Sequence, residues 1–216
     1  MSAIGKVEPG GQNISDAIEH IVNGAQEQAL HAETSTGLDH RKLVMWIFIA
    51  SESIFFAALM ATFLIYKSKV PPEEGLHHLN LAVASANTFI LLFSSLTMVL
   101  SLQSIENGKK GRMIFFLIAT ALLGLVFLGG QVFEYNELIT NGISFDTNLF
   151  GSSFFTLTGF HGSHVFVGVI WITMLIIRAL RGGITEHNHL AVELGGLYWH
   201  FVDLVWVVLF TIIYLI

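Results

Sequence analysis

Residues Gly195–Ile216 read GGLYWHFVDLVWVVLFTIIYLI, and this stretch decides the fold class. It is long enough to cross a bilayer as a helix, and it is almost entirely apolar or aromatic. Yet it contains His200 and Asp203, which lie three positions apart and therefore share one face of a helix. A carboxylate near the centre of a membrane span costs roughly 2.5–3.5 kcal/mol on insertion scales, so Asp203 should face the interior of a bundle.

The composition of the whole chain predicts an integral membrane protein. Of its 216 residues, 53% are hydrophobic and only 12% are charged, whereas a soluble domain carries about 25% charged residues. The chain lacks cysteine, which excludes disulfides, iron–sulfur clusters and thiolate metal sites. It shows no basic face and no soluble domain to carry one, so nucleic-acid binding has no support.

Five apolar stretches are each long enough for a hydrocarbon layer of ~30 Å. The predicted spans are 43–66, 79–102, 113–135, 153–177 and 192–216. Residues 1–42 form a polar N-terminal tail, in which apolar residues at helical spacing indicate either a short amphipathic helix or a loose tail. We therefore predict an all-α membrane protein, a bundle of five transmembrane helices over 43–216 with short connecting loops.

The lysine and arginine residues predict the orientation of the bundle. Eight of these ten residues lie in the tail and in the loops after the second and fourth spans, which are all on one side of the membrane. Lys67 and Lys69 lie on the opposite side. Positively charged residues remain on the cytoplasmic side of a membrane. The N-terminus is therefore predicted to be cytoplasmic, and five spans then place the C-terminus outside.

Several polar residues are predicted at membrane depth, where none should face lipid. Glu52 lies close to the midplane of the first span. The second span carries amide and hydroxyl residues that suit interhelical hydrogen bonds, namely Asn87, Thr88, Ser94, Ser95 and Thr97. The other candidates for a polar cluster inside the bundle are Gln131, Glu134, His161, His164, His200 and Asp203.

Three interpretations of these residues compete. A dimetal site would need Glu-x-x-His pairs on two helices, whereas the pairs here are Gln-x-x-Glu, His-x-x-His and His-x-x-Asp. A bis-histidine haem needs two histidines at equal depth, whereas His164 and His200 differ by roughly 9 Å of helix rise. A transporter usually shows repeats or broken helices, and none is visible. The patterns favour a packing and lipid-contact bundle within a larger complex, whose acids are protonated or paired.

Four motifs, in this order, resemble subunit III of the haem–copper oxidases. They are Trp46–Phe56 (WIFIASESIFF), Leu122–Tyr135 (LLGLVFLGGQVFEY), Gly151–Gly168 (GSSFFTLTGFHGSHVFVG) and Tyr198–Trp206 (YWHFVDLVW). The third and fourth are the most specific. The match extends from about Lys42 to the C-terminus, and it implies a multi-pass protein of the bacterial cytoplasmic (inner) membrane.

The resemblance implies a non-catalytic subunit. In this family subunits I and II carry the haems and copper ions, so no cofactor or metal is expected in this chain. Subunit I is the expected main partner, with subunit II and possibly subunit IV as further partners. The family also binds phospholipid, and the motif match suggests Trp46, Glu134, His161 and His200 as contributors. Glu52 resembles the family's buried, carbodiimide-reactive carboxyl, which makes it the candidate for a proton-related role.

The sequence departs from the mitochondrial form of the family, which has seven spans. Here the first motif opens the first span, so two spans are absent, as in many bacterial members. In the seven-span form the lipid cleft lies between those two helices and the other five. Its walls must here come from elsewhere, and we expect extra helices of subunit I to supply them.

We therefore expect subunit III of a bacterial terminal oxidase, a complex that reduces dioxygen and pumps protons while this chain does neither itself. Tyr198 and Val202 favour cytochrome c as the electron donor. The alternatives are quinol oxidase subunit III, the related accessory subunit of a nitric-oxide reductase system, and a small proton or ion transporter. Within the opening stretch we expect Asp203 to be a buried structural partner of His200, and Glu52 to be the acid with a functional proton.

Overall fold

The computed structural model describes residues 39–69, 81–146, 149–186 and 188–216. The amphipathic helix predicted within the tail falls outside these residues. The chain divides into two units, 1–46 and 47–216. The described part of the first unit is the start of a helix, where the backbone N–H of Arg41 donates to the Asp39 carboxylate at 2.8 Å.

All five predicted spans are helices in the structure, and the described residues form no β-sheet. The helices are α2 (His40–Lys67), α3 (Leu81–Glu106), α4 (Lys110–Thr140), α5 (Leu149–Leu180) and α6 (Leu190–Phe210). Each is long and apolar enough to cross a membrane, which confirms the predicted fold class. At 31 residues, α4 is roughly 46 Å long, so its ends extend beyond the hydrocarbon layer. Which terminus is cytoplasmic stays a prediction.

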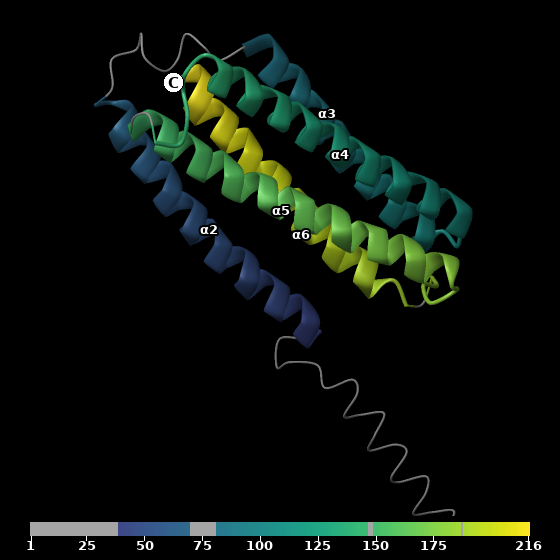
Figure 1. Ribbon diagram of the computed structural model, residues 1–216. Coiled ribbons are helices and arrows are strands. Elements are labelled where there is room, and N and C mark those ends of the chain that lie inside the picture. Colours follow the sequence, from purple (N-terminus) through teal and green to yellow (C-terminus); the bar gives the residue numbers. More distant parts are fainter. Residues whose placement is uncertain (1–38, 70–80, 147–148, 187) are drawn as a thin grey trace, which may run out of the picture. The chain divides into compact units, whose positions relative to one another are not determined.

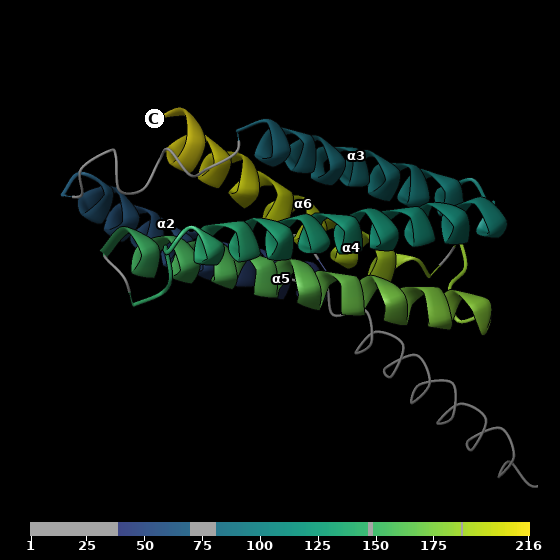
Figure 2. The same cartoon turned by 45° about the horizontal axis from the view of Figure 1, so that its top comes forward.

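Four helices of the second unit pack in a closed ring. Helix α3 packs against α4 and α6, and α5 packs against α4 and α6. Both views show these four helices side by side (Figures 1 and 2). The part of α2 within this unit reaches the ring mainly through long side chains, including the ring contacts Phe55–Phe160 and Phe63–Phe150.

Trp199 of α6 fills the centre of this ring. A Cβ atom added at Gly124 of α4 would lie 2.7 Å from the indole, and one added at Gly168 of α5 would lie 2.8 Å from it. The indole N–H donates to the Ser94 hydroxyl of α3 at 2.9 Å. One buried side chain therefore touches all three other helices of the ring, and the two glycines are there because no larger residue would leave room for it.

Hydroxyl and amide residues of α3 hold the neighbouring helices, as their positions in the second span predict. Trp206 lies two turns after Trp199 and donates to the Thr88 hydroxyl at 3.0 Å. Three further bonds between α3 and its neighbours are Asn87 to the Phe127 carbonyl at 3.1 Å, Thr97 with Thr120 at 2.8 Å, and Ser95 with His200 at 2.6 Å. Since lipid offers no competing hydrogen bonds, such contacts specify which helices pair.

Helices α3, α4 and α5 end in the same way. Each is followed by a glycine with positive φ, at Gly108, Gly142 and Gly182. After α3, the N–H of Lys109 returns to the Ser104 carbonyl at 2.8 Å and that of Gly108 to the Ile105 carbonyl at 2.9 Å. This is the Schellman arrangement, which satisfies the last carbonyls of a helix and turns the chain sharply. These turns allow short loops between consecutive spans.

Candidate functional site

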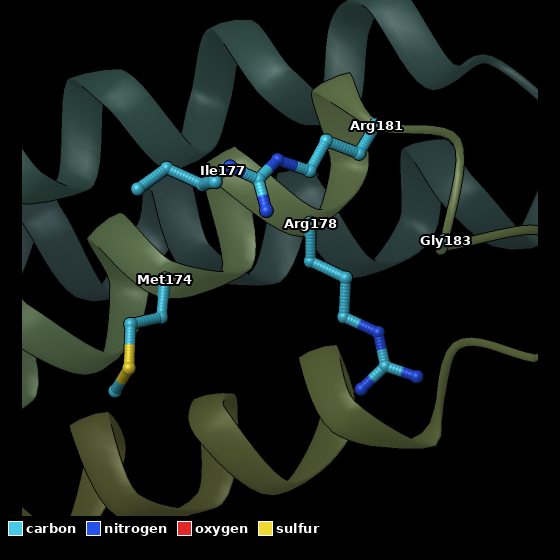
Figure 3. Close-up of a pocket in the computed structure, with 5 residues that line it drawn as sticks. All are labelled: Met174, Ile177, Arg178, Arg181 and Gly183. Carbon is cyan, nitrogen blue, oxygen red and sulfur yellow. The ribbon is translucent and has the colours of Figure 1, made fainter.

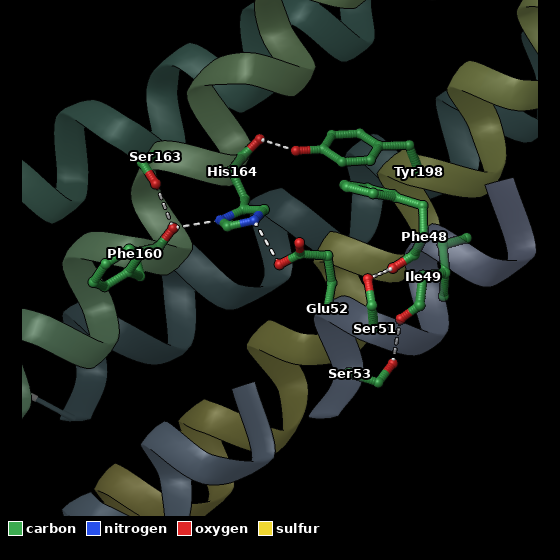
Figure 4. A network of polar contacts seen from close by, with 9 residues as sticks. All are labelled: Phe48, Ile49, Ser51, Glu52, Ser53, Phe160, Ser163, His164 and Tyr198. Atoms are coloured by element: carbon green, nitrogen blue, oxygen red, sulfur yellow. Dashed lines mark hydrogen bonds and ion pairs between the residues drawn. The ribbon is translucent and has the colours of Figure 1, made fainter. Parts of the chain in front are cut away.

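The acid predicted to carry a proton lies against a histidine of another helix. Glu52 of α2 and His164 of α5 are joined by a contact of 3.3 Å between Oε2 and Nε2, and both side chains are partly exposed. Figure 4 shows the imidazole between the Glu52 carboxyl and the backbone of α5. The structure thus brings together two residues from the first and third motifs, 112 positions apart in the sequence.

The geometry requires a proton between these two side chains. The other ring nitrogen of His164, Nδ1, is 2.7 Å from the Phe160 carbonyl, which can only accept, so Nδ1 carries a hydrogen. A hydrogen bond between Nε2 and Glu52 then needs one more proton, held either by the imidazole or by the carboxyl. In both states the pair has no net charge. The two states differ only in which side of a 3.3 Å contact holds the proton.

Aromatic residues fix the position of His164. The Tyr198 hydroxyl of α6 donates to the His164 carbonyl at 3.0 Å (Figure 4). The Phe56 ring meets the imidazole edge-on, with centroids 5.0 Å apart, and Phe48 stacks on Tyr198 at 6.3 Å. Tyr198 belongs to the fourth motif, so three of the four motifs meet around this pair.

His161 lies one turn from His164 but in a different environment. Its side chain is 0% exposed, and neither ring nitrogen has a hydrogen-bond partner among the described residues. The imidazole stacks on Trp206 at 4.9 Å and meets the edge of Phe127 at 5.8 Å. The structure therefore places His161 in the aromatic core of the bundle.

His200 and Asp203 share a face of α6 as predicted, but no hydrogen bond joins them in the described part of the chain. His200 Nδ1 instead bonds the Ser95 hydroxyl at 2.6 Å. Asp203 is 3% exposed, and neither of its carboxyl oxygens has a partner among the described residues. The Ser95 hydroxyl lies near this carboxyl, but no hydrogen bond joins the two. The partnership of His200 with Asp203 that the sequence suggests does not form, because the hydroxyl on α3 takes the imidazole.

Gln131 and Glu134 take part in a polar cluster between α4, α5 and the end of the chain. The Gln131 amide donates to the Thr158 carbonyl at 2.8 Å and to the Tyr135 hydroxyl at 3.1 Å. The Tyr214 hydroxyl donates to the Glu134 carboxyl. Both residues are buried and are hydrogen-bonded to other elements of the bundle.

Helix α6 continues as a π-helix, η3 (Thr211–Leu215), and a lysine from α2 binds it. The ammonium group of Lys67 donates to the carbonyls of Ile212 and Ile213 at 3.1 and 3.3 Å. A cation at the carboxyl end of a helix is favourable, since the last carbonyls lack partners within the helix. In the sequence, Lys67 stands directly after the predicted span 43–66, and no local pattern indicates this role.

Two arginines line a pocket that the sequence analysis missed. Arg178 and Arg181 at the end of α5 border a pocket of about 280 Å³ together with Met174, Ile177 and Gly183. In Figure 3 the Arg178 side chain extends away from α5, and Arg181 folds back along the helix toward Ile177. The only sign of this pocket in the sequence is the pair of arginines at the end of an apolar span. Such a pair is not specific, because arginines are common at the cytoplasmic end of any span.

Trp46, the remaining candidate, is 54% exposed, so this chain leaves much of its indole free for other contacts. Within the described ranges, no group of three histidine, aspartate or glutamate side chains could hold a metal ion. Glu52 and His164 form an acid–base pair that joins α2 to α5.

Comparison with known protein families decides the relationship. The family described as cytochrome c oxidase subunit III matches this sequence over residues 16–216. The chain belongs to the cytochrome c oxidase subunit III family. The match includes all four motifs, and it confirms the resemblance to subunit III of the haem–copper oxidases.

Relatives within the subunit III family cover nearly the whole chain. Cytochrome c oxidase subunit 3 of Bacillus sp. strain PS3 is 38% identical, over 88% of this chain and 96% of its own length. Quinol oxidase subunit 3 of Bacillus subtilis is 34% identical, over 92% of this chain and 97% of its own. Cytochrome c oxidase subunit 3 of Synechocystis is 39% identical, over 82% and 76%. Both kinds of oxidase occur among these relatives, so the family match does not select the electron donor.

Proposed function

We propose that this chain is the non-catalytic subunit III of a bacterial terminal oxidase, and that it stabilises subunit I and supports proton uptake. The observation that carries the proposal is the contact of Glu52 with His164 at 3.3 Å, within a chain of the subunit III family. Ionisable residues at membrane depth cost free energy, so they are rare there and usually mark a functional site. The haems and copper ions belong to partner subunits I and II in this proposal.

The pair acts as a proton store beside the path through which subunit I takes up protons. While the pair holds its proton it is neutral, so the proton is kept there without a net charge inside the membrane. Release of the proton to subunit I leaves one carboxylate, which takes up the next proton. Both side chains are partly exposed in this chain, so a partner that covers α2 would contact the pair and could exchange the proton with it. The Tyr198 hydroxyl holds the backbone of His164, which keeps the imidazole in reach of Glu52.

Subunit I packs against α2 in this proposal. Only 11% of the most apolar window of α2 is buried within this chain, and the exposed side chains include Ile47, Ile54 and Ile65. A partner that covers this surface would lie next to Glu52. In this proposal, extra helices of subunit I supply the contacts that cover α2. Subunit II and possibly subunit IV are further partners.

Phospholipid binding is the second part of the proposal. The pocket beside Arg178 and Arg181 combines two guanidinium groups with the apolar side chains of Met174 and Ile177. Arginine binds phosphate through paired N–H groups, and the apolar wall suits an acyl chain. Trp46, exposed at the start of α2, is a second lipid contact. The protein would be located in the cytoplasmic (inner) membrane.

Cytochrome c is the proposed electron donor, and quinol is the second candidate. The motif around Tyr198 and Val202 favours cytochrome c, whereas the relative from Bacillus subtilis, at 34% identity, carries the name of a quinol oxidase subunit. The donor binds another subunit, so this chain affects the choice only through the complex it joins.

Purification of the native complex through a tag on this chain tests the proposal. We expect a mass-spectrometric subunit list with subunits I and II, an optical spectrum of haem a, and a copper-A domain in subunit II. A subunit II without copper A, together with quinol oxidation, would assign the quinol oxidase instead. A nitric-oxide reductase partner, or ion flux from the purified chain alone in liposomes, would contradict the proposal.

A further inference from the structure

A groove lies between the end of α3 and the start of α4, away from the acid–base pair. Its volume is about 440 Å³. Helix α3 contributes Leu100, Gln103 and Ser104, and α4 contributes Arg112, Phe115 and Phe116. None of these residues lines the pocket of Arg178 and Arg181.

The groove changes in character along its length. Gln103 and Arg112 lie within one turn of the helix ends at Glu106 and Lys110, where a span meets the head-group region of a bilayer. Leu100 and Phe116 lie about one turn deeper. Roughly 4.5 Å of helix rise separates Gln103 from Leu100, and roughly 6 Å separates Arg112 from Phe116. A polar end therefore opens to the head groups, and an apolar end opens to the acyl chains.

The polar end has donors without partners. No hydrogen bond or ion pair engages the Arg112 guanidinium or the Gln103 side-chain amide in the part of the chain that the structure describes. Ser104 differs, since its hydroxyl already donates to the Leu100 carbonyl at 2.6 Å. Arginine and an amide offer several N–H groups and so are suited to the oxygens of a phosphate.

The surrounding turn is basic. Lys109 and Lys110 precede Arg112, which gives three positive charges within four residues. The acids at this end are Glu106 of α3 and Glu186, whose carboxylate lies over Gly108. Basic pockets between transmembrane helices on the cytoplasmic side attract acidic lipid head groups, and the α3–α4 turn is on the side predicted to be cytoplasmic.

We propose that this groove binds an acidic phospholipid, with the phosphate at Arg112 and Gln103 and an acyl chain along Leu100, Phe115 and Phe116. Three features match this ligand: a cationic entrance, unpartnered phosphate donors, and an apolar floor at acyl-chain depth. The site goes beyond the proposed function, since it involves neither the Glu52–His164 pair nor the α5 arginines. It does not depend on the electron donor of the complex.

The test uses the intact purified complex in nanodiscs with a photoactivatable acyl chain on either phosphatidylglycerol or phosphatidylcholine. Cross-links are mapped by mass spectrometry to Phe115 and Phe116. We expect phosphatidylglycerol to label the groove more strongly than phosphatidylcholine. Arg112→Gln should lower the labelling by phosphatidylglycerol roughly fivefold, the effect of one basic residue at an acidic membrane surface.

A steric variant tests the same site without changing its charge. Gly111 lines the groove, and a Cβ atom there would meet nothing within 4 Å, so Gly111→Leu can fill the groove without disturbing the helices. It should abolish the labelling. Gly129 of the same helix is equally open but lies outside the groove, and Gly129→Leu should label like the unmodified complex. Lys69→Gln is the charge control, because Lys69 follows α2 and lines neither pocket, and it should leave labelling of the groove unchanged.

The alternatives predict different results. Equal labelling by the two lipids, or no effect of Arg112→Gln and Gly111→Leu, would overturn the proposal. So would an unlabelled groove whose residues cross-link to another subunit. If sodium phosphate displaces the label at an ionic strength where chloride does not, the site takes a soluble anion and the lipid assignment is wrong. Should neither variant assemble, the comparison of the two lipids on the unmodified complex still decides.

Discussion

Helices α2 and α6 are both apolar enough to cross a membrane, yet they relate to the rest of the chain in opposite ways. The most apolar window of α2 is 11% buried within the chain, whereas that of α6 is 56% buried. Helix α6 completes the ring through Trp199 and Trp206, and α2 reaches it through a few long side chains. Each helix also carries one acid at membrane depth, Glu52 in α2 and Asp203 in α6, and the acid of α6 is the more buried of the two.

The two acids show what burial does to a carboxyl group in a membrane protein. Glu52 of α2 is partly exposed and has a basic partner at 3.3 Å. Asp203 of α6 is sealed in the ring without a hydrogen-bond partner among the described residues. An acid that exchanges protons needs both a partner and access, and only Glu52 has them. The candidate functional acid therefore lies on the loosely packed helix α2, whereas the tightly packed helix α6 holds the bundle together.

Removal of the α6 anchor should have the largest effect. Trp199→Ala would leave a cavity between Gly124 and Gly168 and would leave the Ser94 hydroxyl without its donor. Large-to-small changes of this kind cost roughly 3–5 kcal/mol in packed cores. We expect a large loss of assembled complex, measured as yield and thermal inactivation of the purified oxidase. Trp46→Ala in α2 is the matched control, because Trp46 is 54% exposed; equal losses for both would break the comparison.

The second prediction concerns the sealed acid. An unpartnered buried carboxyl loses its hydration without compensation, at a cost of about 1–3 kcal/mol. Asp203→Leu should therefore leave the thermal stability of the complex unchanged or raise it. Pairing of Asp203 with His200, as the sequence alone suggests, predicts a loss instead. Differential scanning calorimetry of the complex separates the two, and Asp203→Asn controls for the shape of the side chain.

The contact between the two helices at the end of α2 gives a smaller effect. Lys67→Met keeps the length and apolar stem of the side chain but removes both hydrogen bonds to the carbonyls of η3. Loss of these partly buried bonds should cost about 1 kcal/mol. We expect faster hydrogen exchange confined to residues 211–215, measured by mass spectrometry. Lys69→Met is the control, and protection of η3 that is unchanged in Lys67→Met would contradict the role of this lysine.

The smallest effect on stability, and the most informative for function, is expected for Glu52→Gln. The amide can still donate to His164 Nε2, so assembly should be normal, but the pair no longer holds an exchangeable proton. Turnover should fall modestly at high pH, where protons are scarce, and should be normal at low pH. Oxygen consumption of the purified complex across pH measures this. Identical profiles for the variant and the unmodified complex would remove the proton-storage role.

Sequence reasoning recovered the elements of this fold better than their pairings. Runs of apolar residues predicted all five helices, because length and hydropathy alone decide what can span a bilayer. It also predicted the interhelical role of the α3 hydroxyls. It did not pair His200 with Ser95, since local spacing favours Asp203 on the same helix face. Ser95 comes within hydrogen-bond distance of His200 because of the way α3 is rotated against α6, which the sequence of either helix alone does not show.

The candidate site was predictable in its acid but not in its base. Glu52 stands out because a midplane carboxyl is expensive, and His164 was one of several histidines at comparable depth. His161 and His164 lie one helical turn apart on α5. The His161 imidazole points into the core, and the His164 imidazole points toward α2. The direction of each depends on how α5 rotates in the bundle, and no pattern within α5 specifies it.

The position of Trp199 has a consequence for biogenesis. The indole contacts α3, α4 and α5, yet it belongs to the last of the five helices to leave the ribosome. Until α6 has entered the bilayer, the small-residue surfaces at Gly124 and Gly168 face lipid, and the Ser94 hydroxyl lacks its donor. The first four helices can insert in order, but they can reach their final spacing only around α6. A chain that stalls before that point would lack the one side chain that contacts all three other helices of the ring.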